Sequence, residues 1–155
     1  MIMITNLETA KTLEADTKYA VIRSYKYPVP GIEQIKELSP SWNLFREYMK
    51  LRENRMWNRT AFEESYAPKF VTEIAHDREA RRILHRFLER DKAGETVILA
   101  CFCKNEALCH RLVLADILMG LGADVRLQSG KIPSKRWYGA YMRELAAAKK
   151  KKDET

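Results

Sequence analysis

An unbroken apolar run, TVILACFC at residues 96–103, constrains the fold of this chain more than any other segment. Its length suits a strand, and continuous hydrophobicity is typical of a strand buried on both faces of a parallel sheet. Residues 105–121 follow as a helical pattern that is apolar nearly all round, and residues 124–128 then form another strand pattern. Strand, helix and strand in this order predict a right-handed parallel unit.

The rest of the chain adds further strand and helix patterns. We expect strands over 1–6 and 19–25, with a short helix over 7–14 between them, and a long connection over 26–38. Further helices are expected from Ser39-Pro40 to about 54–57, from a capping box at Thr60 with a kink or split at Pro68, from Asp77 to Gly94, and over 134–150. The pattern predicts an α/β fold, a small, mostly parallel sheet with helices on both faces, three-layered and Rossmann-like.

Length and charge indicate the organisation and the type of partner. The 155 residues suit one domain, expected over 1–148, with a disordered basic tail over 149–155. The net charge is +7, and the tail contributes +2 of it, four lysines less Asp153 and Glu154, which leaves +5 on the body. Such a balance favours acidic partners, whether a small anion, a nucleotide or nucleic acid, and leaves the oligomeric state open.

The cysteines indicate the compartment. All three lie within residues 101–109, whereas a secreted disulfide framework spreads an even number of cysteines along the chain. The sequence shows neither an apolar run of about 18 residues nor a secretion signal at its start. We therefore expect a cytoplasmic protein with reduced cysteines and no membrane association.

The cysteines also indicate the functional site, because they surround the point where the apolar strand ends and the next helix begins. Ligands of open parallel sheets bind beyond the carboxyl ends of the strands, near helix N-termini. Cys101 and Cys103 share a face of the strand, and the neighbouring Lys104, His110 and Arg111 favour a thiolate. The segment predicts a site that binds an anion or activates a sulfur nucleophile.

These residues resemble the signature of the DUF488 family. LACFCKNEALCHR at 99–111, followed by Leu114-Ala115, is similar to the family's Leu-rich strand, its Cys with a Cys or Glu two residues on, its acidic turn and its Cys-His-Arg triplet. Residues 22–25 resemble the family's early Arg-Ser, and residues 57–58 and 62–70 its helical middle. The resemblance covers most of 18–128 and implies the fold more than the function, because the family's activity is unassigned. Many relatives have an Asp where this chain has Val21, so no carboxylate role is expected there.

The first interpretation of the site is a pocket for a phosphate-bearing, nucleotide-like ligand, without a cofactor. The expected ligand-binding residues are Arg23, Ser24, Tyr25, Lys104 and Arg111. The expected catalytic residues are Cys103 or Cys109 as nucleophile and His110 as proton donor or general acid, although the sequence does not decide whether a bond is broken. The residue six after Cys103 is Cys109 and not the Arg of a phosphatase loop, which argues against a phosphatase.

Two other interpretations remain open. Cys101, Cys103, Cys109 and His110 form a plausible Cys₃His set for a structural zinc ion, in a basic nucleic-acid or protein-interaction domain. Adjacent helical residues diverge by about 100°, so this set requires the helix to begin at or after Cys109 and His110. Alternatively, the cysteines are small buried hydrophobes, Cys101 above all, His110 is a satisfied polar residue and Arg111 is solvated.

Overall fold

The structure is a computed structural model that describes residues 1–153. Within these residues one sheet contains five strands, all parallel, in the order β3-β2-β4-β1-β5. The strands are β1 (Ile2–Asn6), β2 (Thr17–Ala20), β3 (Glu33–Gln34), β4 (Val97–Cys101) and β5 (Val125–Leu127). The expected parallel sheet is confirmed, and the apolar run supplies its central strand, in which every residue is buried.

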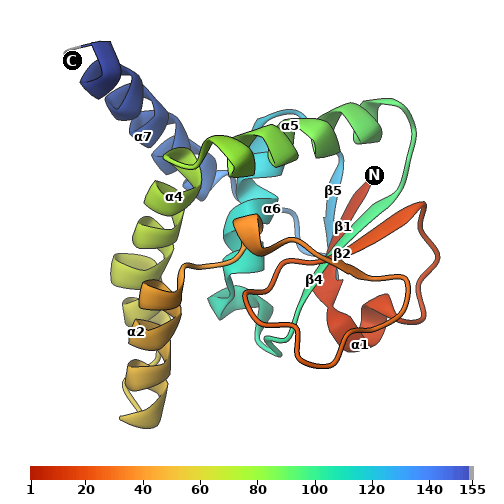
Figure 1. The fold of residues 1–155 in the computed structure, drawn as a ribbon, viewed down its shortest axis with the longest axis horizontal. Helices are drawn as coiled ribbons and strands as arrows, with labels where there is room; N and C mark the ends of the chain where they lie inside the picture. The colour runs from red at the N-terminus through yellow and green to blue at the C-terminus, as the bar shows by residue number, and fades with distance from the viewer. Residues whose placement is uncertain (154–155) are drawn as a thin grey trace.

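Helices cover both faces of the sheet, as expected. Between β1 and β2 runs α1 (Leu7–Ala10), and between β4 and β5 runs α6 (His110–Gly120). The two connections cross the sheet in opposite directions, so right-handed crossovers put α1 and α6 on opposite faces. Both helices pack against β1 and β4, which makes the fold three-layered. Figure 1 shows α6 at the centre of the molecule and α1 beside the lower end of the strands.

The α6 face carries the remaining helices. They are α2 (Trp42–Glu53), α3 (Arg59–Ala61), α4 (Ala67–Ala75), α5 (Arg78–Lys92) and α7 (Arg136–Asp153). The helix α5 packs against β4, while α4 and α7 pack against α6 and against each other. Asp77 caps α5 as expected, by accepting hydrogen bonds from the N–H groups of Glu79 and Ala80. In Figure 1, α2, α4 and α7 lie together on the side away from β1 and β5.

Two strands end earlier than expected. The strand expected over 19–25 ends at Ala20, and the one expected over 96–103 ends at Cys101. The two strands pair with each other, and the last bond between them runs from the N–H of Val21 to the carbonyl of Ala100, so they no longer support each other beyond this point. The freed residues after both strands form loops. A short 3₁₀ helix, η3 (Glu106–Leu108), then precedes α6, where one continuous helix over 105–121 was expected.

Two helix starts also differ from expectation. Ser41, not Ser39, caps α2, because its hydroxyl accepts from the N–H of Leu44 while its own O–H and N–H bind Glu73. Asn58, not Thr60, caps α3 by accepting from the N–H of Ala61. The break expected near Pro68 is present as a wide π-helical turn, Phe62–Tyr66, between α3 and α4.

The basic tail is helical where disorder was expected. Helix α7 continues through residues 149–152 to Asp153, since alanine and lysine have high helix propensity and lysines interact favourably with a helix C-terminus. Residues 154 and 155 lie outside the described part of the chain. The single domain over 1–148 stays a prediction. No helix within residues 1–153 combines the length and the hydrophobicity that a membrane span requires.

Candidate functional site

The candidate site lies between the carboxyl ends of β2 and β4. These strands are neighbours, but the chain leaves β2 toward β3 on one side and leaves β4 toward β5 on the other. Parallel sheets bind ligands in the crevice at such a point of divergence. A cavity of about 380 Å³ occupies it, lined by the residues that follow both strands. From β2 come Ile22, Arg23 and Ser24, and from β4 come Cys101, Phe102 and Cys103.

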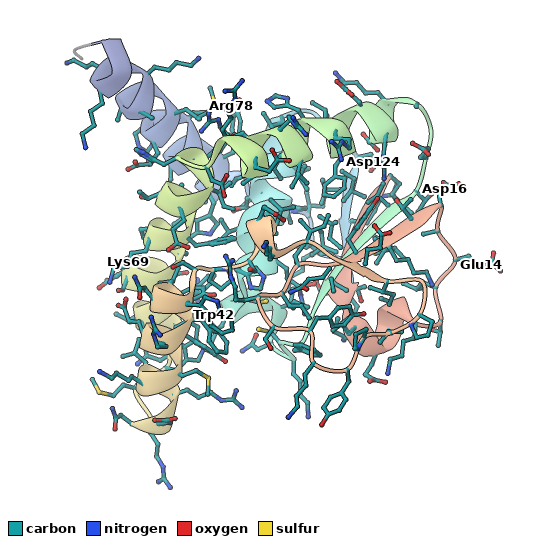
Figure 2. All side chains as sticks on the ribbon, in the orientation of Figure 1. Glu14, Asp16, Trp42, Lys69, Arg78 and Asp124 are labelled. Carbon is teal, nitrogen blue, oxygen red and sulfur yellow. The ribbon has the colours of Figure 1, made fainter. Side chains whose placement is uncertain are left out.

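Aromatic side chains form one wall of this cavity. Tyr48 of α2 meets the ring of Trp57 edge-on, with centroids 4.7 Å apart, and Trp57 meets Tyr66 of the π turn at 5.2 Å. Phe45 and Trp42, about one and two turns before Tyr48 on α2, extend the wall toward solvent. Trp42, labelled in Figure 2, lies on the side of α2 that faces the strands and is 50% exposed. The wall can therefore stack against a planar ligand.

Three cysteine sulfur atoms form a second part of the cavity lining. Cys101 ends β4, Cys109 directly precedes α6, and η3 reverses the chain between them. The Sγ atoms of Cys101 and Cys109 are 2.9 Å apart, and all three cysteine sulfurs lie within 4.8 Å of one another. All three cysteines line the cavity, with Cys101 and Cys109 buried and Cys103 half-buried.

The guanidinium of Arg111 lies behind this sulfur cluster. It donates from Nη1 to the Sγ of Cys101 over 3.3 Å and to the carbonyl of Cys103 over 2.7 Å. Arg111 is 1% exposed, and its Nε has no hydrogen-bond partner within the described residues. No carboxylate of residues 1–151 forms an ion pair with Arg111. Burial of an unpaired charge costs much free energy, so the guanidinium requires an anionic partner. The Sγ of Cys101 is the group that contacts it and can carry that charge.

The three thiols differ in the direction of their pKa shifts. Hydrogen bonds from Cys103 and Cys109, together with the charge of Arg111, hold the pKa of Cys101 well below that of an ordinary thiol. Donation to Cys101 and burial raise the pKa of Cys103 to about 12. Burial raises the pKa of Cys109 well above the usual range, and its donation to Cys101 adds to the effect. The thiolate therefore resides on Cys101.

His110 connects the cluster to the end of β2. Its Nε2 lies 2.7 Å from the carbonyl oxygen of Val21, which can only accept a hydrogen bond, so Nε2 carries a proton. In the neutral ring Nδ1 is then an acceptor, and it lies 3.7 Å from the Sγ of Cys109. The ring also packs edge-on against Phe70 of α4 at 5.4 Å. These contacts fix both the tautomer and the orientation of the imidazole.

Comparison with protein families identifies the lineage of this site. Residues 2–122 match the family model DUF488-N3a, described as "Active DUF488-N3 subclade". The chain belongs to the DUF488 family. Comparison with the curated proteins and with the solved structures found no match. The matched segment includes the carboxyl ends of β2 and β4, the aromatic wall and all three cysteines.

The DUF488 site brings together most of the residues expected from the sequence. Cys101, Cys103, Cys109 and His110 all line the cavity, as do Arg23 and Ser24 from the other strand. Arg23 is held in place by donating from Nε to the carbonyl of Pro40 over 3.0 Å. The groups therefore converge on one hollow, although none of their expected roles in binding or catalysis is tested by this arrangement.

The other three expected ligand-binding residues do not line this cavity. The hydroxyl of Tyr25 folds its own loop together, accepting from the N–H of Val29 and donating to the carbonyl of Ile32. Lys104 lines a neighbouring hollow of about 410 Å³ together with Lys11. Arg111 contacts sulfur in the interior. Its position suits it to stabilise the Cys101 thiolate rather than to contact a ligand directly.

The zinc set expected from the sequence is incomplete in this geometry. Helix α6 begins at His110, as that set requires, and the three sulfurs are close enough to hold a metal ion. The imidazole, however, lies outside the group of three sulfurs, because its Nε2 is bound to Val21. Thiolates on one zinc ion stand about 3.8 Å apart for tetrahedral bonds of about 2.3 Å. The Cys101–Cys109 pair would have to open to reach that separation.

The sequence analysis did not predict the aromatic wall, nor the presence of Lys26 at the cavity. Phe45, Tyr48 and Tyr66 lie in segments expected only to form helices, and Lys26 and Tyr27 lie in the expected connection over 26–38. One signal was available, since Trp42, Phe45 and Tyr48 are three residues apart on one helix, and Trp57 and Tyr66 follow. Phe102 was read as strand interior, yet it is 61% exposed at the mouth of the cavity.

Proposed function

We propose that this DUF488 protein binds a phosphate-bearing, nucleotide-like ligand in the cavity between β2 and β4. The observation that carries the proposal is the pairing of an aromatic wall with cationic side chains on one hollow. A nucleotide combines a flat, largely apolar base with an anionic group, and this hollow offers both kinds of partner. A volume of about 380 Å³ lies within the range of small-molecule sites, about 300–1,000 Å³.

The base is assigned to the aromatic wall. Trp42 and Tyr48 of α2, with Trp57, present rings on one side of the cavity, and Trp42 keeps half of its surface free. Stacking of a base on an aromatic side chain contributes about 1–3 kcal/mol and tolerates different bases. The wall therefore favours nucleotides as a class and supplies no evident preference for one base.

The phosphate is assigned to the loop that follows β2. Arg23, Ser24 and Lys26 line the cavity and bring two cationic groups and a hydroxyl. Neither cation forms an ion pair with a carboxylate of residues 1–151. Both are therefore available to an anionic ligand, in line with the positive charge of the chain.

Cysteine chemistry on this ligand forms the second half of the proposal. Cys101 is the proposed nucleophile, in place of Cys103 or Cys109, because it holds the thiolate and also lines the cavity. Cys103 and Cys109 would act as hydrogen-bond donors to it, and His110 as the acceptor of a proton from Cys109. A thiolate is the reactive form of cysteine, so a ligand with an electrophilic centre near Cys101 would react there.

The test is calorimetric titration of the protein with nucleoside 5′-monophosphates, the matching nucleosides and inorganic phosphate. We expect the monophosphate to bind more tightly than either part. Trp42→Ala should weaken monophosphate binding about tenfold, since loss of one stacking contact costs about 1–3 kcal/mol. Lys26→Ala should weaken the monophosphate and leave the nucleoside unchanged.

Two control variants lie away from the cavity. Ile132→Ala removes an apolar side chain that is 80% exposed, and Arg82→Ala removes an exposed cation on α5. Neither substitution should change the affinities that the titrations measure. Absence of binding by every nucleotide, or equal losses in the cavity and control variants, would contradict the proposal. Tighter binding of a single-stranded oligonucleotide that depends on Arg82 would instead favour a nucleic-acid surface on α5.

A further inference from the structure

The Cys101–Cys109 pair has a geometry that ligand binding alone does not require. Its sulfurs are 2.9 Å apart, and atoms poised to react stand about 3–3.5 Å apart. Cys101 is fixed by the central strand β4, and Cys109 by the start of α6, which packs on that strand. Two sulfurs held this close by separate rigid elements are placed to bond to each other.

The surroundings supply the charge and the base that such a bond needs. Arg111 contacts the Sγ of Cys101 at 3.3 Å and stabilises an anionic sulfur there. On the other side, Nδ1 of His110 lies 3.7 Å from the Sγ of Cys109 and is the acceptor side of the ring. The pair therefore combines a stabilised thiolate, a thiol and an adjacent proton acceptor. Cys101 lines the cavity, so the cavity is the route by which an oxidant would approach its sulfur.

We propose that Cys101 and Cys109 are a redox-active pair that is oxidised to a disulfide by low-molecular-weight disulfides, RSSR. The Cys101 thiolate attacks one sulfur of RSSR, the S–S bond of RSSR breaks, and RS⁻ leaves with the electron pair. Cys109 then passes its proton to His110 and attacks the Sγ of Cys101, which expels the second RS⁻. The protein pair loses two electrons, RSSR gains them, and the proton from Cys109 ends on a released thiol.

Cys103 is not the partner of Cys101 in this reaction. The Sγ of Cys103 lies within 4.8 Å of the other two sulfurs, but the contact at 2.9 Å joins Cys101 and Cys109. Cys103 instead remains as a single thiol beside the bridge. Oxidation also removes the anionic sulfur that faces Arg111, so the cavity gains positive charge when the bridge forms.

The sequence allows a direct test by peptide mapping. Trypsin cleaves after Lys92, Lys104 and Arg111, so Cys101 and Cys103 fall on peptide 93–104 and Cys109 falls on peptide 105–111. Wild-type protein is equilibrated with reduced glutathione and glutathione disulfide at increasing ratios, quenched in acid, alkylated and digested without reductant. We expect peptides 93–104 and 105–111 to be joined in the oxidised samples, with one alkylated cysteine remaining. Dithiothreitol should separate them.

Two variants identify the bonded sulfurs. Cys103→Ser should still yield the joined peptides, whereas Cys109→Ser should not. If Cys103→Ser fails to fold, fragment-ion sequencing of the joined wild-type peptides makes the same distinction. The proposal is overturned if all three cysteines stay alkylatable at the highest disulfide ratio, or if the bridge involves Cys103. Resistance of all three to alkylation that chelation of metal relieves would also overturn it, in favour of a metal site.

Discussion

Arg111 and Cys101 form a buried contact between a guanidinium and a thiol sulfur, 3.3 Å long, with no carboxylate of the described residues paired to the arginine. Hydrogen bonds from Cys103 and Cys109 lower the pKa of Cys101 most, and the charge of Arg111 adds to the effect. Arg111 is therefore a residue that stabilises charge on sulfur, and the proposed anionic ligand is assigned to the loop after β2.

The contact predicts the effect of Arg111→Met, which keeps a long side chain and removes the charge. The pKa of Cys101 should rise, because the guanidinium no longer stabilises its thiolate. The measurement is the rate of alkylation of Cys101 by a small haloacetamide across pH, read on peptide 93–104 in a Cys103→Ser background. The matched control, Arg82→Met, should leave the profile unchanged. An unshifted profile in Arg111→Met would contradict the assignment of the thiolate.

The pKa shifts of the three thiols also predict how the stability of the fold depends on pH. The low pKa of Cys101 means that the unfolded chain binds a proton which the folded chain does not, so stability rises with pH up to the ordinary thiol pKa, about 8.5. Above that pH the raised pKa values of Cys103 and Cys109 reverse the sign, since the folded chain now retains protons that the unfolded chain releases. That part of the stability is lost as pH approaches about 12, the pKa of Cys103.

Urea unfolding of the wild type between pH 6 and 10 should therefore show a maximum near pH 8 to 9 from the thiols. A Cys103→Ala variant should lose stability less steeply above the maximum, since one of the retained protons is gone. If the unfolding free energy fell with pH equally steeply in the two proteins above pH 9, the raised pKa of Cys103 would be refuted.

His110 provides a separate stability prediction. Its Nε2 satisfies the buried carbonyl of Val21 at the end of β2. His110→Ala leaves that acceptor unpaired and should destabilise the fold by about 1–3 kcal/mol, in addition to the cavity it creates. His85 is exposed on α5, so His85→Ala is the control and should change the unfolding free energy by less than about 0.5 kcal/mol. Equal effects of the two substitutions would show that the His110 contact contributes nothing.

The packing of α6 against α7 predicts opposite effects for two glycines. A Cβ at Gly120 would overlap the ring of Tyr138, whereas a Cβ at Gly139 would meet only a side-chain nitrogen of Arg143 at 3.5 Å. Gly120→Ala should therefore destabilise the protein by about 1–3 kcal/mol through overpacking. Gly139→Ala should stabilise it by up to about 1 kcal/mol, because alanine favours a helix interior. Thermal unfolding distinguishes the two, and a neutral Gly120→Ala would contradict the close approach of these helices.

Local signals were sufficient for much of the fold. The apolar run at 96–103 contains the buried central strand, Asp77 caps a helix as predicted, and the strand-helix-strand order is present. The strand ends were predicted wrongly because they depend on where a neighbouring strand stops, which a local sequence pattern does not show. The capping role of Ser41 was missed for the same reason, because it depends on a hydrogen bond to Glu73, which is far away in the chain.

The site was predicted in position but not in detail. Clustering of Cys, His and Arg in one segment located the cavity, because those residues are close in sequence as well as in space. The aromatic wall comes from α2 and the π turn, and only the packing of these helices beside the sheet brings it there. The sequence also could not show that Arg111 is buried, since that depends on how α6 packs against the sheet and the other helices.

The most direct test of the account is a crystal structure of the protein with a bound nucleoside 5′-monophosphate. The account predicts the base against Trp42, Tyr48 or Trp57 and the phosphate within hydrogen-bond distance of Arg23 or Lys26, with the ligand facing Cys101. A ligand seated on the arginine-rich surface of α5, or a cavity between β2 and β4 that remains without nucleotide while the ligand binds elsewhere, would contradict it.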